Sequence, residues 1–335
     1  MNLDMISVRE HQEALENRIM SPFGTRSNET SGRKREEEPD PIRTNFQRDA
    51  DRILHCNSFQ REKDKTQVII GAFVENGDHY RTRMTHSLEV SRVARTVARS
   101  LGLNEDLAEA SALAHDLGHT PFGHTGESVL NKFFDFGFSH TLHSIRVAEE
   151  LEKNGRGLNL CWETLNAVEN HSGLSNSPQA ATLEGQILPF ADKIAYLTSD
   201  FADAMHFGIV KNEDLPLALR EVFGQGKTNA MGILVNGLIV GSYGRDTIKM
   251  ENSIYDLMSE FRKWMFEYVY RSKQMNEQRV VASAIVNDLC GYYLEHPIEI
   301  VGFPRTDNVA RDVCDFIAGM TDHYAIATHK ELFKN

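Results

Sequence analysis

Apolar residues recur at three- and four-residue spacing over much of the chain, which is the period of a helix with one buried face. The clearest stripe lies within residues 86–102, and Gly102 is well placed to end that helix. It consists of Val90, Val93, Ala94, Val97 and Leu101. The pattern predicts an amphipathic helix over this segment.

A second helix is predicted directly after the first. Asn104 is a favourable N-cap, and Glu105 and Asp106 lie in the first turn, where carboxylates interact well with the helix dipole. Gly118 is expected to end this helix. The chain is then expected to restart at Pro121, turn at Gly123 and resume as a helix. Because the turn between the first two helices is short, we expect them to be antiparallel neighbours.

The remaining pattern is also mainly helical. Further helical patterns cover residues 140–155, 178–205, 231–242 and 254–275. A kink is expected at Pro189. Strand signals are few, and the best of them, residues 66–73, predicts at most a short β-hairpin. We therefore predict a mostly α protein.

The composition is that of an ordinary globular protein. Of 335 residues, 41% are hydrophobic and 25% are charged, and no apolar run is long enough to cross a membrane. The N-terminus does not have the pattern of a secretory signal. The four cysteines form no CxxC pair, so we expect neither disulfides nor a thiolate zinc site, and a reducing cytoplasm is the expected location. The net charge of −12 is unlike that of a general nucleic-acid binder.

The chain is expected to have three parts. Residues 1–42 should form an N-terminal helix and an extended polar arm, since residues 22–42 are polar and contain three prolines. That arm is interpreted either as a mobile linker or as a segment that orders against a neighbouring subunit. Residues 43–215 should form the catalytic core, and residues 216–335 a helical region packed on it.

Candidate metal ligands are concentrated in one part of the chain. Half of the fourteen histidines fall between positions 79 and 143, and the pair His115–Asp116 closes the second predicted helix. His86 opens the antiparallel helix and should lie close to that pair. Imidazole and carboxylate without thiolate suit Mn, Fe, Mg, Zn or Ni. Asp192 is the predicted fourth ligand, because a carboxylate on so apolar a helix is costly unless it is paired or metal-bound. Any one of these histidines alone is more often structural.

The order H…HD…D resembles the signature of HD-domain metal-dependent phosphohydrolases. Longer segments resemble, more specifically, the deoxyguanosinetriphosphate triphosphohydrolase (dGTPase) family of dNTP triphosphohydrolases. These segments are residues 79–90, 115–127, 137–147 and 191–204, and the resemblance extends over about residues 43–204. It implies an HD-type helical fold with additional C-terminal helices. It also implies hydrolysis of a deoxynucleoside triphosphate to deoxynucleoside and intact triphosphate, with a divalent metal ion as cofactor.

The resemblance also implies roles for individual residues. The implied metal ligands are His86, His115, Asp116 and Asp192. The implied catalytic residues are His124, Glu127, His140 and His119. Among these, either His124 or His140 would be the general acid, and the sequence does not decide between them.

Substrate contacts follow from the same resemblance. Phosphate-binding cations are implied at Arg83 and Lys193. Tyr196 and Asp200 share a helix face with Lys193 and are implied to lie near the sugar. Gln67 is implied to read the 3′-hydroxyl, and Arg61 is a further implied substrate contact.

Two alternatives in function remain open at this level. One is an HD phosphohydrolase whose substrate is a monophosphate, a cyclic nucleotide or an alarmone, and the other is a non-catalytic nucleotide-binding regulator. The resemblance implies a homo-oligomer, and an activating nucleotide at a second site is an associated expectation. Binding of single-stranded DNA receives no support from the net charge.

Overall fold

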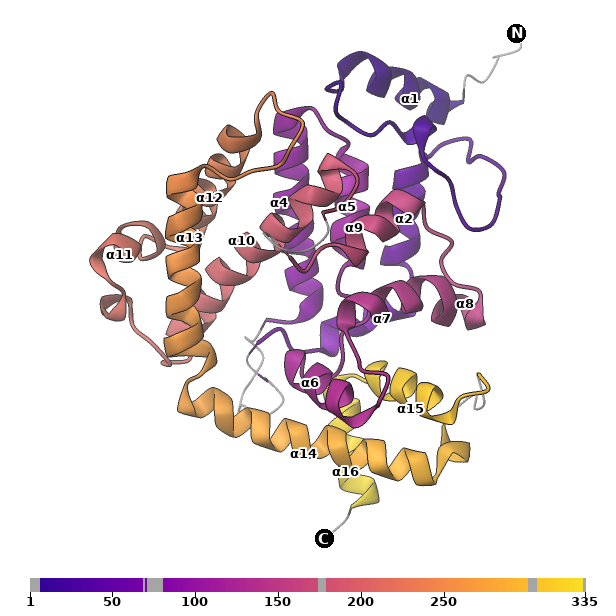
Figure 1. Cartoon of the computed structure of the whole chain (residues 1–335), viewed down its shortest axis with the longest axis vertical. Helices are drawn as coiled ribbons and strands as arrows, with labels where there is room; N and C mark the ends of the chain where they lie inside the picture. Colours follow the sequence, from indigo (N-terminus) through magenta and orange to yellow (C-terminus); the bar gives the residue numbers. More distant parts are fainter. Residues whose placement is uncertain (1–6, 69, 71–80, 174–178, 301–305, 334–335) are drawn as a thin grey trace.

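The computed structural model describes residues 7–68, 70, 81–173, 179–300 and 306–333, and it is built from helices throughout (Figure 1). The α-helices are α1 (Val8–Ile19), α2 (Asn45–Leu54), α3 (Asn57–Arg61), α4 (Arg83–Leu101), α5 (Glu105–Ala114), α6 (His124–Phe133), α7 (His140–Arg146), α8 (Glu152–Gly155), α9 (Trp162–Glu169), α10 (Leu183–His206), α11 (Leu217–Phe223), α12 (Lys227–Ser242), α13 (Asn252–Met265), α14 (Lys273–Glu295), α15 (Val309–Ala318) and α16 (Asp322–Leu332). Short 3-10 turns lie at Ser27–Glu29, Glu62–Asp64, Asn212–Asp214 and Pro297–Glu299, and π-helical turns at Val147–Leu151 and Phe266–Tyr270. The prediction of a mostly α protein is confirmed.

No β-strand occurs in the described residues, which contain two isolated bridges, Arg33–Cys161 and Thr66–Thr82. The hairpin expected over residues 66–73 therefore appears only as the Thr66–Thr82 bridge. Positions 69 and 71–73 lie outside the described residues. No described helix is both long and apolar enough to cross a membrane.

Helices α4 and α5 form the predicted antiparallel pair. Gly102 ends α4 with φ +68°, and the Asn104 side chain accepts hydrogen bonds from the N–H groups of Asp106 and Leu107. The expected boundary at Gly118 is wrong, because α5 ends at Ala114 and tight turns follow it. The next helix begins at His124, directly after the turn expected at Gly123, where positive φ angles at Phe122 and Gly123 interrupt helical geometry.

The larger helical bundle is organised around α10, which continues through Pro189. Its apolar face packs against the stripe of α4, so that Val90, Val97, Ile187 and Ile194 are buried together. Helices α2, α5 and α9 cover the same bundle (Figure 1). Each fully buried aliphatic side chain contributes roughly 1.5–3 kcal/mol of stabilisation. The packing of α4 against α10 is therefore a main source of the stability of this bundle.

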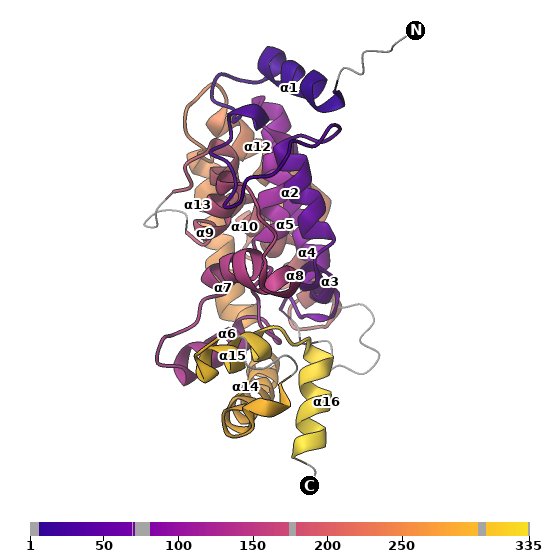
Figure 2. The same ribbon diagram turned by 90° about the vertical axis from the view of Figure 1, so that its right-hand side faces the viewer.

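The C-terminal helices divide between two cores. Helices α11–α13 pack against α10 and share its core, where the rings of Phe223 and Phe261 stack with centroids 3.7 Å apart. Helices α14–α16 form a second core with α6. Both views place α14–α16 at one end of the molecule and α1 at the other (Figures 1 and 2).

The polar arm after α1 is ordered against its own chain. The Glu184 carboxylate accepts hydrogen bonds from the N–H and the hydroxyl of Thr25, at 2.9 Å each. Glu163 similarly binds the Ser31 N–H at 2.6 Å, and Arg33 forms an ion pair with the buried Asp49. Buried carboxylates of the bundle thus hold the arm in place.

Two buried polar residues connect the C-terminal core to the loops that precede α4 and α6. The Lys65 ammonium donates to the carbonyl oxygens of His119 and Ala318. The Asp322 carboxylate, at the start of α16, accepts from the N–H and hydroxyl of Thr66 and from the Phe122 N–H at 2.9 Å. Because these groups are buried, each depends on its partners.

Replacing Asp322 with Ala should destabilise the protein. Three buried donors would lose their acceptor, and we expect a loss of about 2–4 kcal/mol in the free energy of unfolding. Urea denaturation would measure it. Asp322→Asn retains an acceptor oxygen and should cost less, so equal losses for the two variants would contradict this account.

Candidate active site

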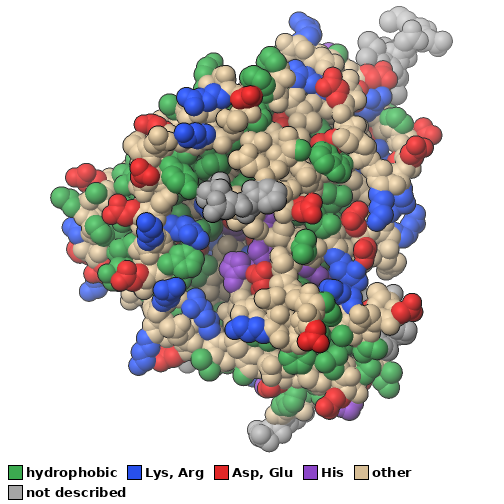
Figure 3. Space-filling model, viewed as in Figure 1, with side chains coloured by type: hydrophobic (Ala, Val, Ile, Leu, Met, Phe, Trp, Pro, Cys, Tyr) green, Lys and Arg blue, Asp and Glu red, His purple; other side chains and the backbone are tan. Residues whose placement is uncertain are grey.

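Four predicted metal ligands meet where three helices converge. His86 lies in the first turn of α4, His115 and Asp116 follow the end of α5, and Asp192 lies in the middle of α10. His86 Nε2 is 3.0 Å from Asp192 Oδ1, and His115 Nε2 is 3.4 Å from Asp116 Oδ2 and 4.0 Å from Asp192 Oδ1. Figure 3 shows histidines at the floor of a hollow, with lysine and arginine side chains around it.

The His115 ring is oriented as a metal-binding imidazole would be. Its Nδ1 donates to the Ala112 carbonyl oxygen at 2.7 Å, which leaves a lone pair on Nε2. That Nε2 atom is buried and has no hydrogen-bond partner within the described part of the chain. An orphaned buried lone pair beside two carboxylates fits a divalent cation, and ligand atoms of His86, His115 and Asp116 lie within 4.8 Å of one another.

Asp116 is the most heavily engaged member of this group. Burial opposes its ionisation, but electrostatic interactions with the His115 ring and the Arg83 guanidinium hold the pKa of Asp116 well below its usual range. Arg83 Nη1 donates to Asp116 Oδ2 at 2.6 Å, and the arginine is only 2% exposed. Its Nε and Nη2 atoms have no partner among the described groups, so the predicted phosphate contact retains free donors.

The loop before α6 has an unusual backbone. Phe122 and Gly123 have φ angles of +59° and +56°. A Cβ atom on Gly123 would lie 2.8 Å from Arg83 Nη2 and 3.5 Å from the Gln67 carbonyl oxygen. Left-handed geometry at a non-glycine residue costs energy and is maintained by the surrounding structure. The loop therefore brings Arg83 and the backbone of Gln67 close to the start of α6.

Gln67 and Arg61, the two remaining predicted substrate contacts, lie in different parts of the structure. Gln67 donates its backbone N–H to the Arg81 carbonyl oxygen, and its side-chain oxygen is buried without a partner in the described structure. Arg61 donates to the Ser58 hydroxyl at 3.0 Å and lines a separate cavity of about 1090 Å³. That cavity also contains Arg146 and Asp315 and has none of the four predicted metal ligands in its lining.

The predicted catalytic residues form a second cluster centred on Glu127. Its carboxylate oxygens lie 2.8 Å from His124 Nδ1 and 2.8 Å from His140 Nδ1, and one of them also accepts the His140 N–H. Burial opposes ionisation, but hydrogen bonds from His124 and His140 hold the pKa of Glu127 well below its usual range. His119 stacks on His140 with ring centroids 4.2 Å apart.

Exposure separates the two candidate acids. The His124 side chain is 73% exposed, whereas that of His140 is 13% exposed. His140 uses its second nitrogen as well, since its Nε2 lies 3.3 Å from His171 Nε2. Both nitrogens of His140 therefore face other protein groups.

Sequence reasoning missed His171. It follows α9, is 2% exposed, and lies edge-on to His115 with ring centroids 5.2 Å apart. Its Nδ1 donates to the Val168 carbonyl oxygen at 2.6 Å, as His115 does to Ala112. The signal available in the sequence was a histidine just beyond the end of a helix, as at position 115.

The predicted substrate face of α10 is covered by C-terminal residues. Tyr196 OH accepts a hydrogen bond from Arg262 Nε at 3.2 Å, and Asp200 accepts one from Tyr270 OH at 2.7 Å. Lys193 Nζ lies 3.4 Å from the Pro189 carbonyl oxygen. Arg262 and Tyr270 were not predicted, because nothing in the local sequence places them against α10.

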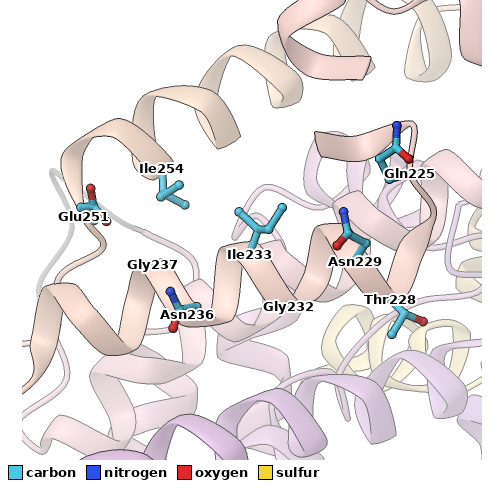
Figure 4. A pocket seen from close by; sticks show the side chains of 9 residues that line it. All are labelled: Gln225, Thr228, Asn229, Gly232, Ile233, Asn236, Gly237, Glu251 and Ile254. Atoms are coloured by element: carbon cyan, nitrogen blue, oxygen red, sulfur yellow. The ribbon is translucent and has the colours of Figure 1, made fainter. Parts of the chain in front are cut away.

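A shallow groove of about 660 Å³ lies between α12 and the start of α13 (Figure 4). Its lining is Gln225, Thr228, Asn229, Gly232, Ile233, Asn236, Gly237, Glu251 and Ile254. With one carboxylate and no imidazole or cation, it offers no comparable chemistry.

This helical fold, with a histidine–aspartate cluster built from α4, α5 and α10, is that of an HD-type phosphohydrolase. The HD domain family model matches residues 83–197, and that of the phosphohydrolase-associated domain matches residues 248–331. A phosphohydrolase structure from Bacteroides thetaiotaomicron shares the fold, with a TM-score of 0.52, 16% identity, and coverage of 84% of this chain and 68% of that one.

Curated relatives match over nearly the whole chain. Proteins described as deoxyguanosinetriphosphate triphosphohydrolase-like include one from Caldanaerobacter subterraneus at 45% identity, covering 98% of this chain and 96% of the relative. Another, from Clostridium perfringens, is 42% identical, and one from Desulfatibacillum aliphaticivorans is 41% identical, each with 98% of both chains covered. The chain belongs to the deoxyguanosinetriphosphate triphosphohydrolase-like family.

The stability of the metal-free protein should depend on pH through Asp200. Burial raises the pKa of Asp200 to about 7, although its hydrogen bond from Tyr270 lowers it. Below the unfolded pKa of 3.8 the Asp200 carboxyl is protonated in both the folded and the unfolded state, so the folded state has its full stability. As pH rises from there through about 7, the unfolded state loses this proton more readily than the folded state, and that stability is lost. Relative to wild type, Asp200→Asn should gain up to about 4 kcal/mol over this range.

Urea denaturation with a chelator present, at several pH values, would measure this difference. Tyr270→Phe keeps the acid and removes its donor, so that variant should retain the pH dependence. Parallel stability curves for wild type and Asp200→Asn would show that Asp200 ionises normally.

Proposed function

We propose that this protein is a metal-dependent dNTP triphosphohydrolase, with dGTP among its substrates, which releases deoxynucleoside and intact triphosphate. The observation that carries the proposal is the convergence of His86, His115, Asp116 and Asp192 beside a separate histidine–glutamate cluster. The names of the relatives, at 41–45% identity over nearly full length, support the same substrate class.

His86, His115, Asp116 and Asp192 would hold the divalent metal ion. Their donor chemistry suits Mn, Mg, Fe, Zn or Ni, and we propose Mn or Mg in the working enzyme. The ion, when bound, would neutralise charge on the α-phosphate and favour the attack of water there. Two observations support this assignment: His115 Nε2 has no hydrogen-bond partner among the described residues, and the Asp192 carboxylate lies 4.0 Å from it.

His124 is the proposed general acid at the scissile oxygen. Its Nδ1 is bound to Glu127, its side chain is mostly exposed, and Glu127 would orient the ring and stabilise its protonated form. His140 is less suited to that role, because both of its nitrogens face protein groups. His119, which is buried near Asp116, would help to position the phosphate.

Arg83 and Lys193 would bind the phosphate chain. Charge-assisted hydrogen bonds of this kind contribute about 1.5–3 kcal/mol each, and Arg83 has donors left over from its pairing with Asp116.

Tyr196 would face the sugar, with its ring against C2′ rejecting a 2′-hydroxyl by steric exclusion. Asp200, which is buried and bonded to Tyr270, would lie behind Tyr196 near the sugar. Gln67 is the remaining proposed contact of the substrate. Arg61, which the resemblance implies as a substrate contact, lines the separate cavity and so belongs to the proposed second site.

Assembly and regulation belong to the same proposal. Exposed apolar side chains on α14, such as Val280 at 71% exposure, support a homo-oligomer. The cavity that contains Arg61 and Arg146 is separate from the metal cluster, which supports an activating nucleotide at a second site. Four free, buried cysteines support a cytoplasmic location.

Product analysis is the direct test. The full chain with Mn²⁺ is incubated with each dNTP, singly and in mixtures, and products are separated by anion-exchange chromatography. We expect intact triphosphate and deoxynucleoside, and neither from Asp116→Ala. Phosphate or pyrophosphate would indicate an HD enzyme of another substrate class, and no product in any mixture would favour a nucleotide-binding regulator.

The acid assignment can be tested with a substrate whose leaving group needs no protonation. His124→Ala should lower kcat on a dNTP by about 10²–10⁴-fold, because general acid catalysis contributes that much. The loss should be much smaller on a p-nitrophenyl ester of triphosphate. His140→Ala should lose similar activity on both substrates, and the opposite ranking would assign the acid to His140.

A further inference from the structure

One side of α12 differs in charge from the rest of the molecule. Residues 228–244, which cover α12 from its second residue and the turn after it, contain no Asp, Glu, Lys, Arg or His and form the longest uncharged run in the sequence. A helix that is uncharged and largely apolar is normally buried on all sides. Part of this one faces solvent, because Val240 is 54% exposed and Tyr243, just past the helix, is 71% exposed.

The solvent-facing residues follow one stripe along the helix, at three- and four-residue spacing. This stripe, which we call the α12 face, consists of Thr228, Asn229, Gly232, Ile233, Asn236, Val240 and Tyr243. The other side of α12 packs against α4, α10 and α13, where Leu234 and Leu238 are buried in the core. The α12 face is therefore the part of this helix that the fold of the single chain leaves uncovered.

The α12 face is complementary to itself. Asn229 lies three residues before Gly232, and Asn236 lies three residues after Ile233 (Figure 4). If two copies cross antiparallel about a two-fold axis between positions 232 and 233, each Asn229 faces the Asn236 of the other copy. A carboxamide both donates and accepts hydrogen bonds, so these two residues can pair on both sides of the axis.

The shape of the face allows a close approach at the same point. A Cβ atom built on Gly232 meets nothing within 4 Å, whereas Ile233 beside it carries a branched side chain and lines the groove between α12 and α13. Across the axis, Ile233 of one copy would fill the open space over Gly232 of the other. Glu251, the one carboxylate in the lining of the groove, is the N-cap of α13 and lies at one end of it (Figure 4).

The charge of the chain favours this surface for a contact between copies. Each copy carries a net charge of −12, so a contact through most other surfaces would bring like charges together. The α12 face adds none.

We propose that the α12 face binds the α12 face of a second copy of this chain, about a two-fold axis between Gly232 and Ile233. This inference rests on the proposed homo-oligomer and names the surface that forms it.

Sedimentation velocity of the full chain, over a range of concentrations, measures the assembly. We expect a dimer or an assembly of dimers that added salt does not dissociate, because salt screens the repulsion between copies. Gly232→Glu places its side chain in open space and improves helix propensity, so the single chain should fold. In the assembly it would bury an unpaired charge, so it should halve the mass and weaken association by about 100-fold or more.

Val280→Glu is the matched control. Val280 is 71% exposed on α14, the other surface that supports a homo-oligomer, and the substitution adds the same charge there. The mass of the assembly should not change. Circular dichroism would show whether both variants keep the helical content of the wild type.

The two asparagines test the register of the contact. Asn229→Asp alone and Asn236→Lys alone should each weaken the assembly, because each leaves a charge without a partner. The double variant should restore it, since the carboxylate of each copy then faces the ammonium of the other. Within one chain the two positions are about 10 Å apart along the helix, too far for a direct ion pair.

Three results would overturn the proposal. A wild-type chain that is monomeric at every concentration would remove the proposed homo-oligomer as well. An assembly that keeps its mass with folded Gly232→Glu would place the contact on another face, which is α14 if Val280→Glu breaks it. A double variant as weak as the single ones would exclude this two-fold register.

Triphosphate release is assayed on the same preparations. A chain that assembles as expected and releases no triphosphate would keep this interface and lose the proposed reaction. A chain that releases triphosphate as a monomer would keep the reaction and lose the interface.

Discussion

The burial of the Asp116 carboxylate is the constraint on which the site depends. A charged carboxylate with 4% exposure is stable only when its partners are arranged around it. Arg83 provides a charge-assisted hydrogen bond, while His86, His115 and His119 surround the remaining space within 4.0 Å. Helices α4 and α5 must pack as a close antiparallel pair to bring these groups together, and their apolar stripes drive that packing.

The rigidity of the loops around this carboxylate comes largely from the C-terminal core. Lys65 holds the His119 and Ala318 carbonyl oxygens, and Asp322 holds the backbone at Thr66 and Phe122. Burial lowers the pKa of Lys65 to about 7, so even this cation is retained at a cost. The strained backbone before α6 is thus held from outside the HD bundle, which explains why the two matched regions of the chain act as one structure.

One local device recurs in the site and gives it its chemical character. His115 and His171 each follow a helix, and each donates Nδ1 to the carbonyl three residues earlier. The inner nitrogens then point into a shared interior around Asp116. The Glu127 carboxylate likewise binds the Nδ1 atoms of His124 and His140, in place of a backbone carbonyl. The result separates an exposed imidazole, suited to proton transfer, from buried ones suited to binding cations.

The sequence by itself determined the helical class, the α4–α5 pair and the pairing of His86 with His115–Asp116, because these depend on local period, caps and short connections. It also brought Glu127 and His124 together, since they are three residues apart on one helix. Only the tertiary structure placed Arg262 and Tyr270 on α10, moved Arg61 to a separate cavity, and set His171 against His140. These contacts join segments 31–70 residues apart or depend on the packing of the C-terminal helices, so no local pattern encodes them.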